Sequence, residues 1–312
     1  MAMFTVPKLD PISIRNHLGS CGGKLVGCIA VLAWIPLAWT PMTLADENPE
    51  TKLLKTFVDE LVSITPGQGQ FPKAFRMGSA NGPASEQPVH EVSLTKPFAM
   101  SRYEVPQNLY EFVMGENPSR WKGPRNSAEM MTWQEANTFC ERLTERLRQK
   151  KLIGDSELIR LPTEAEWEYC CRAGTKTAYS FGESATRPGD VGKSASILDA
   201  YAWHTGNAAG NDPPVGALKP NPWGLYDMHG YLSEFVADNW HDNYQGAPSD
   251  GSAWSTKTPP NPKSARTVIR GGSWKDAYPI LRSAARKPFG LTDRNDAVGF
   301  RCVKSTGSTN AN

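Results

Sequence analysis

The sequence predicts an α+β domain with little regular secondary structure. Glycines and aromatic residues alternate with charged residues in short segments bounded by turn-forming residues, a composition typical of a packed but irregular fold. Two segments, 132–150 and 163–172, carry the caps and the apolar spacing of helices.

The first 45 residues have the order of a bacterial-type secretory signal. Lys8, Arg15 and Lys24 precede an apolar run at 25–39, and small residues lead to Ala45, after which we expect cleavage. The apolar run is shorter than the ~20 residues that span a membrane comfortably, and an uncleaved signal anchor is the alternative. The sequence therefore predicts an exported protein, placed in the periplasm, outside the cell or in a secretory lumen.

The charge of the chain argues against two classes of partner. The sequence has 34 Lys and Arg against 32 Asp and Glu, and the basic excess lies in the predicted signal. The remaining residues show no cluster of Lys and Arg. Because nucleic acids and anionic membranes attract concentrated positive charge, we expect neither as a partner beyond the alternative signal anchor.

Residues 46–65 are predicted to form a linker and one short amphipathic helix on the domain surface. The apolar residues of this helix recur at helical spacing: Leu53, Leu54, Phe57, Leu61 and Val62. One large domain follows at 66–304, and a flexible tail is expected at 305–312.

The two helices of this domain are predicted from their caps. Thr132 is followed by Glu135, and Thr163 by Glu166, the spacing of a capping box. The first helix has an apolar face: Ala136, Phe139, Cys140, Leu143 and Leu147.

Three glutamates in the second helix resemble a catalytic cluster: Glu164, Glu166 and Glu168. Because these glutamates are two residues apart, successive side chains point about 200° apart around the helix, so they do not converge. We assign them to capping, the helix dipole and salt bridges. The chain's tryptophans, among them Trp167 and Trp274, are expected to pack in the core.

Four long blocks in one order carry a family resemblance. The last block, 268–303, contains Arg270 to Trp274, Ser283 to Arg286 and Gly299 to Arg301. The others are FRMGSANGPASEQPVHEVSL, IRLPTEAEWEYCCRAGT and PNPWGLYDMHGYLSEFVADNW. From about Pro66 to Val303 the chain thus resembles the formylglycine-generating enzyme family, also called the sulfatase-modifying factor family. The resemblance implies a C-type-lectin-like core with short antiparallel strands, two or three helices and at least one disulfide.

Four cysteines follow the predicted signal: Cys140, Cys170, Cys171 and Cys302. The resemblance implies a disulfide between Cys140 and Cys302. A second family disulfide would join Cys171 to position 283, where this chain has serine. Cys170 and Cys171 therefore lack an evident partner, and buried free thiols are favoured over a strained bond between neighbours.

Copper is not expected from the sequence. Copper-dependent members of this family hold Cu(I) between two cysteines, which suit it because thiolate and Cu(I) are both soft. Here Asp276 stands at the first position and Leu281 near the second, and neither replaces a thiolate. Ser273 is retained from the family's oxygen pocket, whereas Phe235 stands where active members have a tryptophan.

The resemblance also implies structural calcium, held by loop oxygens. The family's ligand positions correspond to Gly230, Leu232 and Glu234, with a second site around Asn207. Loops rich in carbonyls, Asn and Asp can supply the about six to eight oxygens that calcium prefers. A loop tied by Glu234 to backbone amides is the alternative interpretation.

Two arginines of the last block are interpreted as scaffold rather than as anion-binding groups. Arg286 and Arg301 lie in segments expected to be buried strands. We expect each to form a buried ion pair with one of four acids: Glu164, Glu168, Asp227 or Glu234.

Three classes of function remain open. The favoured one is an exported, non-copper family member whose aromatic-rich surface binds a peptide or glycan, or supports a protein complex. The second is a formylglycine-generating oxidase that acts on a sulfatase peptide through another metal arrangement. The third is a different oxygen-dependent modification, such as hydroxylation. Because fold does not fix function, the missing cysteines outweigh the resemblance.

Overall fold

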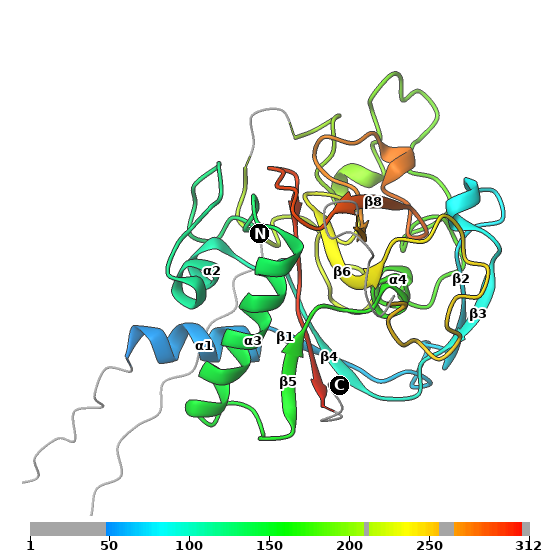
Figure 1. Ribbon diagram of the computed structural model, residues 1–312. Coiled ribbons are helices and arrows are strands. Elements are labelled where there is room, and N and C mark those ends of the chain that lie inside the picture. The colour runs from blue at the N-terminus through cyan, green and yellow to red at the C-terminus, as the bar shows by residue number, and fades with distance from the viewer. Residues whose placement is uncertain (1–47, 209–211, 256–264, 308–312) are drawn as a thin grey trace, which may run out of the picture. The chain divides into compact units, whose positions relative to one another are not determined.

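Short strands and four α-helices build the described part of the protein (Figure 1). The computed structural model describes residues 48–208, 212–255 and 265–307, which belong to one compact unit. The predicted signal at 1–45 lies outside these residues. Within them, no helix combines the length and apolar character needed to cross a membrane.

The helices are α1 (Pro49–Asp59), α2 (Gln107–Met114), α3 (Trp133–Gln149) and α4 (Glu164–Arg172). The strands are β1 (Leu61–Ile64), β2 (Ala74–Met77), β3 (His90–Ser93), β4 (Phe98–Ser101), β5 (Glu157–Arg160), β6 (Ser233–Asn239), β7 (Arg266–Arg270), β8 (Arg286–Gly290), β9 (Val298–Gly299) and β10 (Val303–Thr306). Three short 3₁₀ turns lie at 84–86, 198–200 and 278–280.

The strands form three sheets, with the orders β1-β4-β10-β5, β8-β7-β6-β9 and β2-β3. All pairs are antiparallel except β6 with β9. The C-terminal strand β10 lies between β4 and β5, where Val303 is paired with Met100 and Arg160. The predicted α+β class with short antiparallel strands is confirmed.

Both predicted helices of the domain are present. Thr132 caps α3 and Thr163 caps α4, and each cap is a complete capping box. All five residues of the predicted apolar face of α3 are buried. The sequence did not predict α2, which begins after Pro106 without a side-chain cap and ends at Gly115.

The N-terminal prediction needs a correction. Helix α1 ends at Asp59, and Leu61 and Val62, expected on the helix, belong to strand β1 instead. Val62 pairs with Met100 of β4, so this segment is part of the first sheet rather than a linker. At the other end, Ser305 and Thr306 belong to β10 and not to the predicted tail.

Helix α4 is buried along its whole length, so its charges require partners inside the protein. The three glutamates diverge as predicted and pair with arginines, of which Arg270 contacts both Glu164 and Glu168. Glu164 pairs with Arg286, Glu166 with Arg160, and Glu168 with Arg172 and Arg270. Burial alone would raise the pKa of Glu168, but the two arginines hold this pKa below its ordinary value.

Candidate functional site around the Gly-Gly-Ser-Trp loop

The loop after β7 begins with two glycines in left-handed conformations. Gly271 has φ 89° and Gly272 has φ 69°, a region that other residues rarely adopt. A Cβ on Gly271 would lie 3.2 Å from the Trp167 ring, which fixes the close approach of the loop to α4. The Arg270 guanidinium pairs with Glu168. It also donates to the carbonyls of Ser283, Ala284 and Ala285, which follow the loop, and so holds the C-terminal end of the loop in place.

Asp276, at the first copper-cysteine position of the family, is fully engaged. Its Oδ2 accepts hydrogen bonds from the Ser273 backbone N–H at 2.9 Å and from the Ser273 hydroxyl at 2.8 Å. Its Oδ1 pairs with the Lys287 ammonium at 2.5 Å. The retained Ser273 therefore orders this loop through Asp276.

Leu281, near the second position, points into the protein. It is completely buried in a small apolar cluster with Tyr179 and Leu198. A Cβ on Gly230 would lie 2.9 Å from it, and one on Gly272 would lie 3.0 Å from it. A carboxylate committed to Lys287 and an aliphatic side chain do not fit Cu(I), which needs soft ligands.

Phe235, in place of the family's tryptophan, is also completely buried. Its ring packs edge-on against Phe289 at 5.6 Å between centroids, within the core cluster that contains Phe300. Among the described residues, no group of three or more His, Cys, Asp and Glu is arranged to hold a metal ion.

Trp274, which was expected in the core, is only partly buried and lies with Lys275 at the outer side of the loop. Together with neighbouring residues of other segments they form what we name the Trp121–Trp274 face: Arg120, Trp121, Trp274, Lys275 and Asp296. The Lys275 ammonium lies 4.8 Å from the Trp274 ring centre, and the Arg120 guanidinium 5.0 Å from that of Trp121. Asp296 pairs with both Lys275 and Arg120. Partial burial would raise the pKa of Asp296, but the hydrogen bond and charge of Lys275 hold this pKa below its ordinary value. Trp121 is 45% exposed, which makes it available for contact.

Two of the residues that the resemblance implies for calcium, Glu234 and Asn207, make contacts within the protein. Both Glu234 oxygens accept from Arg301 at 2.7 Å, and one also accepts from the Trp167 indole at 2.8 Å. Asn207 accepts from the His204 backbone N–H at 2.9 Å. Glu234 is thus tied to side chains rather than to backbone amides, and it does not fit the role of a calcium ligand in this arrangement. Calcium at Gly230 and Leu232, and at the second site around Asn207, stays a prediction.

The Arg301–Glu234 pair is one of the expected buried ion pairs, and it lies among further acids. Burial raises the pKa of Glu104 well above its ordinary value, and the nearby Glu234 raises it further. Burial also raises the pKa of Asp227 to about 6. One oxygen of Asp227 is buried with no hydrogen-bond partner among the described residues. The cluster therefore holds more acid than base.

The structure brings the two predicted disulfide cysteines together. The sulfurs of Cys140 and Cys302 lie 3.9 Å apart, and both thiols are free. The resemblance gives these residues a bond, which stays a prediction. Burial raises the pKa of Cys302 well above its ordinary value, so its thiol is protonated at neutral pH.

The other two cysteines are buried free thiols. Cys171 donates to the Met228 carbonyl at 3.4 Å, and its sulfur lies 3.7 Å from His229 Nδ1. Burial raises the pKa of Cys171 to about 12, an increase that the adjacent Ser283 hydroxyl partly offsets. Position 283 thus lies beside Cys171, as the family's second disulfide would require. Cys170 is equally buried, and both thiols are unsuited to nucleophilic chemistry.

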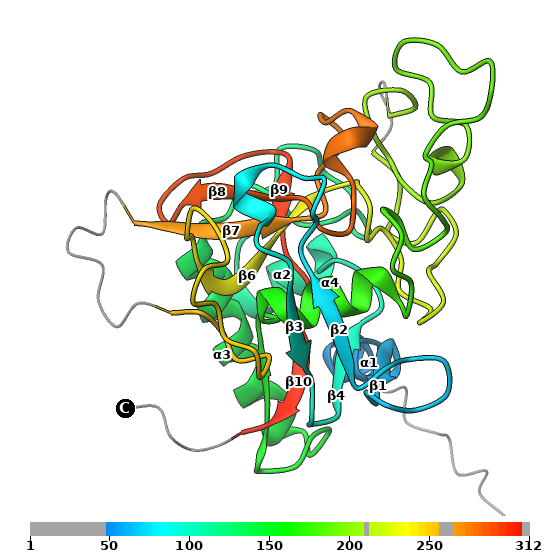
Figure 2. The same ribbon diagram turned by 90° about the vertical axis from the view of Figure 1, so that its right-hand side faces the viewer.

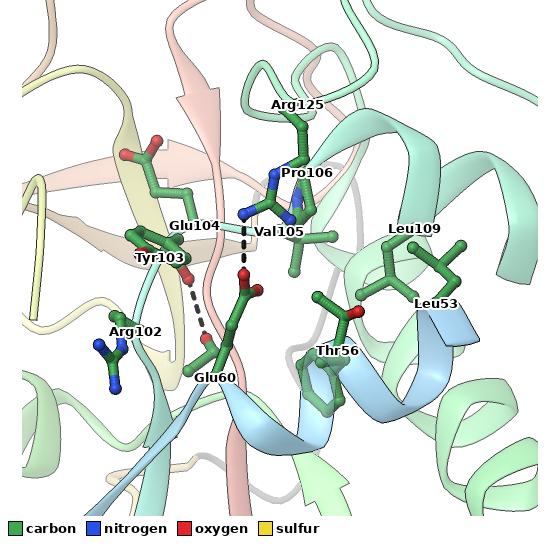
Figure 3. Close-up of a pocket in the computed structure, with 12 residues that line it drawn as sticks. Leu53, Thr56, Glu60, Arg102, Tyr103, Glu104, Val105, Pro106, Leu109 and Arg125 are labelled. Carbon is green, nitrogen blue, oxygen red and sulfur yellow. Dashed lines mark hydrogen bonds and ion pairs between the residues drawn. The ribbon is translucent and has the colours of Figure 1, made fainter. Parts of the chain in front are cut away.

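A hollow between α1 and the segment 101–109 is too small for a ligand (Figure 3). Its volume is about 10 Å³, which is room for about one water molecule. Arg125 closes one side by pairing with Glu60 at 2.9 Å. The Trp121–Trp274 face is the stronger candidate surface.

Comparisons with known proteins agree with the fold. Residues 47–306 match the sulfatase-modifying factor enzyme 1-like domain. The chaperone protein LppX of Paenibacillus barcinonensis is 25% identical over 241 residues, which cover 67% of this chain and 80% of that protein. The formylglycine-generating enzyme of Mycobacterium tuberculosis is 32% identical over 152 residues, 46% of this chain and 50% of the enzyme. The chain thus spans about half the length of that enzyme.

Two solved structures share the fold. PvdO from Pseudomonas aeruginosa superposes with a TM-score of 0.64 at 31% identity and covers 78% of this chain and 94% of its own. The variable protein 1 of Treponema denticola gives a TM-score of 0.61 at 24% identity, over 78% of this chain and 94% of its own. The second likeness concerns the fold alone.

Proposed function

The chain belongs to the sulfatase-modifying factor enzyme 1-like family, and on this premise we propose that it is an exported member without copper oxidase activity. In this proposal the protein is a binding or complex-supporting module for a peptide or glycan. The order of charged, apolar and small residues in the first 45 positions supports export.

The observation that carries the proposal is the chemistry of positions 276 and 281. Asp276 is held by Ser273 and Lys287, and Leu281 is buried among apolar side chains. Replacing two soft thiolates by these groups removes the ligands that the family's copper chemistry requires. Because the fold is intact, what remains is a rigid scaffold that presents surfaces.

The Trp121–Trp274 face supports a binding role. Aromatic rings with adjacent cations provide contact area at low conformational cost and favour peptides and sugars alike. Lys275 and Arg120 lie over these rings and also pair with Asp296, so the face is ordered without a ligand. The relative LppX, which carries the name of a chaperone, also supports a role in binding.

Formylglycine generation is the second candidate, favoured by family membership and by the retained Ser273. Mass spectrometry separates the two. A Cys-x-Pro-x-Arg peptide is incubated with the purified protein, Cu(I), a reductant and oxygen, beside a chelated sample and an active formylglycine-generating enzyme. The proposal expects an unchanged peptide where the positive control gives the aldehyde. Conversion by this protein would contradict it.

A further inference from the structure

Strand β2 has a free edge. It pairs with β3 on one side, and no other described strand pairs with it (Figure 2). The Leu94 N–H donates to the Lys73 carbonyl at 2.9 Å, and the Ser93 N–H donates away from β2 to the Ser249 carbonyl. Because antiparallel hydrogen bonds alternate along a strand, Ala74 and Arg76 direct their backbone groups to the free edge.

Both ends of this edge are occupied by side chains of α4. At one end the Tyr169 hydroxyl donates to the Pro72 carbonyl at 2.9 Å. At the other end the Gly78 N–H donates to Glu168 at 2.9 Å, and its carbonyl accepts from Arg172 at 2.8 Å. For the backbone groups of Ala74 and Arg76, no partner is found among the described residues. Unpaired N–H and C=O groups in a row are a template for a further strand.

A trough follows the same edge. One hollow of about 200 Å³ is lined by Ala74 and Arg76 of β2 and by the segment 174–176. A second, of about 310 Å³, continues past Gly78 to the segment 176–178. Arg76, Arg172 and Lys176 line both, so the two hollows form one trough between β2 and the chain after α4.

The lining of the trough carries a small excess of positive charge. Arg172 is neutralised by Glu168, and Arg282 by Glu86 at 2.8 Å. The remaining cations, Arg76 and Lys176, are exposed, and no ion pair of either is found in the described part of the chain. Glu183 lines the far end, and Glu91, opposite Arg76 on β3, lines neither hollow. Among the described residues, the lining therefore keeps two unpaired cations against one acid.

We propose that this trough binds an extended acidic peptide, which adds to the free edge of β2 as a third strand. Backbone hydrogen bonds to Ala74 and Arg76 provide the affinity of strand addition, and Arg76 with Lys176 selects acidic side chains. This inference deepens the proposed binding function and rests on it. It concerns a different surface from the Trp121–Trp274 face, and its test involves no oxidation, so failure of this test is distinguishable from failure of the proposed function.

The test is fluorescence polarisation with a labelled five-residue peptide of alternating Glu and Val, blocked at both ends. The full chain should bind it saturably, and binding should weaken as salt is raised. A peptide with Lys in place of Glu, and one with N-methylated peptide bonds at alternate residues, should each bind about tenfold more weakly or not at all.

Protein variants locate the site. Arg76→Glu combined with Lys176→Glu should weaken binding of the Glu/Val peptide by about tenfold or more. Arg266→Glu with Lys219→Glu is the matched control, because both side chains are exposed and the charge change is equal. Circular dichroism melting verifies that all variants are folded. Lack of binding to the wild type, equal binding of the N-methylated peptide, or equal loss in the control variant would each overturn the inference.

Discussion

The buried arginines of the closing segment and the loop between them differ in what they retain from the family. Arg270, Arg286 and Arg301 keep the family's residues, and each lies against a buried glutamate. Positions 276 and 281, in the loop, have lost the family's thiolates. Removing one partner of a buried ion pair leaves an uncompensated charge, which costs about 3–5 kcal/mol of folding stability. Replacing a metal-binding side chain in a loop leaves no such buried charge. The buried arginines are therefore constrained by the stability of the fold, whereas positions 276 and 281 are not.

The largest effect is expected from breaking a scaffold pair. Arg301→Leu leaves Glu234 beside Glu104 and Asp227 without a cation, and should lower the free energy of unfolding by about 3–5 kcal/mol in urea denaturation. Arg294→Leu breaks an exposed pair with Glu135 and serves as the control, with an expected loss below about 1 kcal/mol. Equal losses would contradict the distinction between scaffold and surface.

A missing scaffold element can be restored. Ser283→Cys places a thiol beside Cys171 and should form the family's second disulfide under oxidising conditions, with a gain of about 2–4 kcal/mol in the free energy of unfolding. Non-reducing peptide mapping by mass spectrometry detects the bond. In a Cys171→Ala background the same substitution should give neither the bond nor the gain, and free thiols in the single variant would show that the two positions are misaligned.

The acids around Arg301 make scaffold stability depend on pH. Burial raises the pKa of Asp227 to about 6, so its contribution to stability is complete below the unfolded-state value near 4 and is lost as pH rises through 6. Asp227→Asn removes that loss, and Asn tolerates the positive φ of 59°. The variant should gain about 1–2 kcal/mol over the wild type between pH 4 and pH 7. A difference independent of pH in urea denaturation would refute the assignment.

The smallest effect is expected from restoring only the thiolates. Asp276→Cys with Leu281→Cys should leave oxidation of a Cys-x-Pro-x-Arg peptide at background, because Leu281 points into an apolar cluster and Phe235 is buried in the core. Detection of the aldehyde by mass spectrometry is the measurement. Copper-dependent turnover would mean that the loop alone, and not its surroundings, separates this chain from the oxidases.

Signals within one segment of the sequence were sufficient to predict structure that forms within that segment. The threonine caps of α3 and α4 were predicted because a capping box involves residues three apart. Leu61 and Val62 were placed on α1 because they continue its spacing, but pairing with β4 draws them into a strand. That pairing is tertiary, and spacing along one segment does not reveal it.

The same limit applies to the candidate sites. Glu234 was suggested both as a calcium ligand and as one of four possible partners of the buried arginines. Arg301 lies 67 positions away, and the pairing of β6 with β9, which the sequence does not reveal, brings the two together. The Trp121–Trp274 face joins segments about 150 residues apart. The edge of β2 is free because no second described strand pairs with it, which only the assembled sheets reveal. These features follow from the assembled sheets and not from any single motif.

The central claim is that this chain keeps the family's scaffold without its copper site, and a Cu(I) titration tests it most directly. The purified protein competes with a coloured Cu(I) chelator under anaerobic conditions, beside a copper-dependent formylglycine-generating enzyme. The account predicts that this protein leaves the chelator–copper absorbance unchanged while the enzyme removes one equivalent. Stoichiometric copper transfer to this protein that is lost in Asp276→Ala would contradict it.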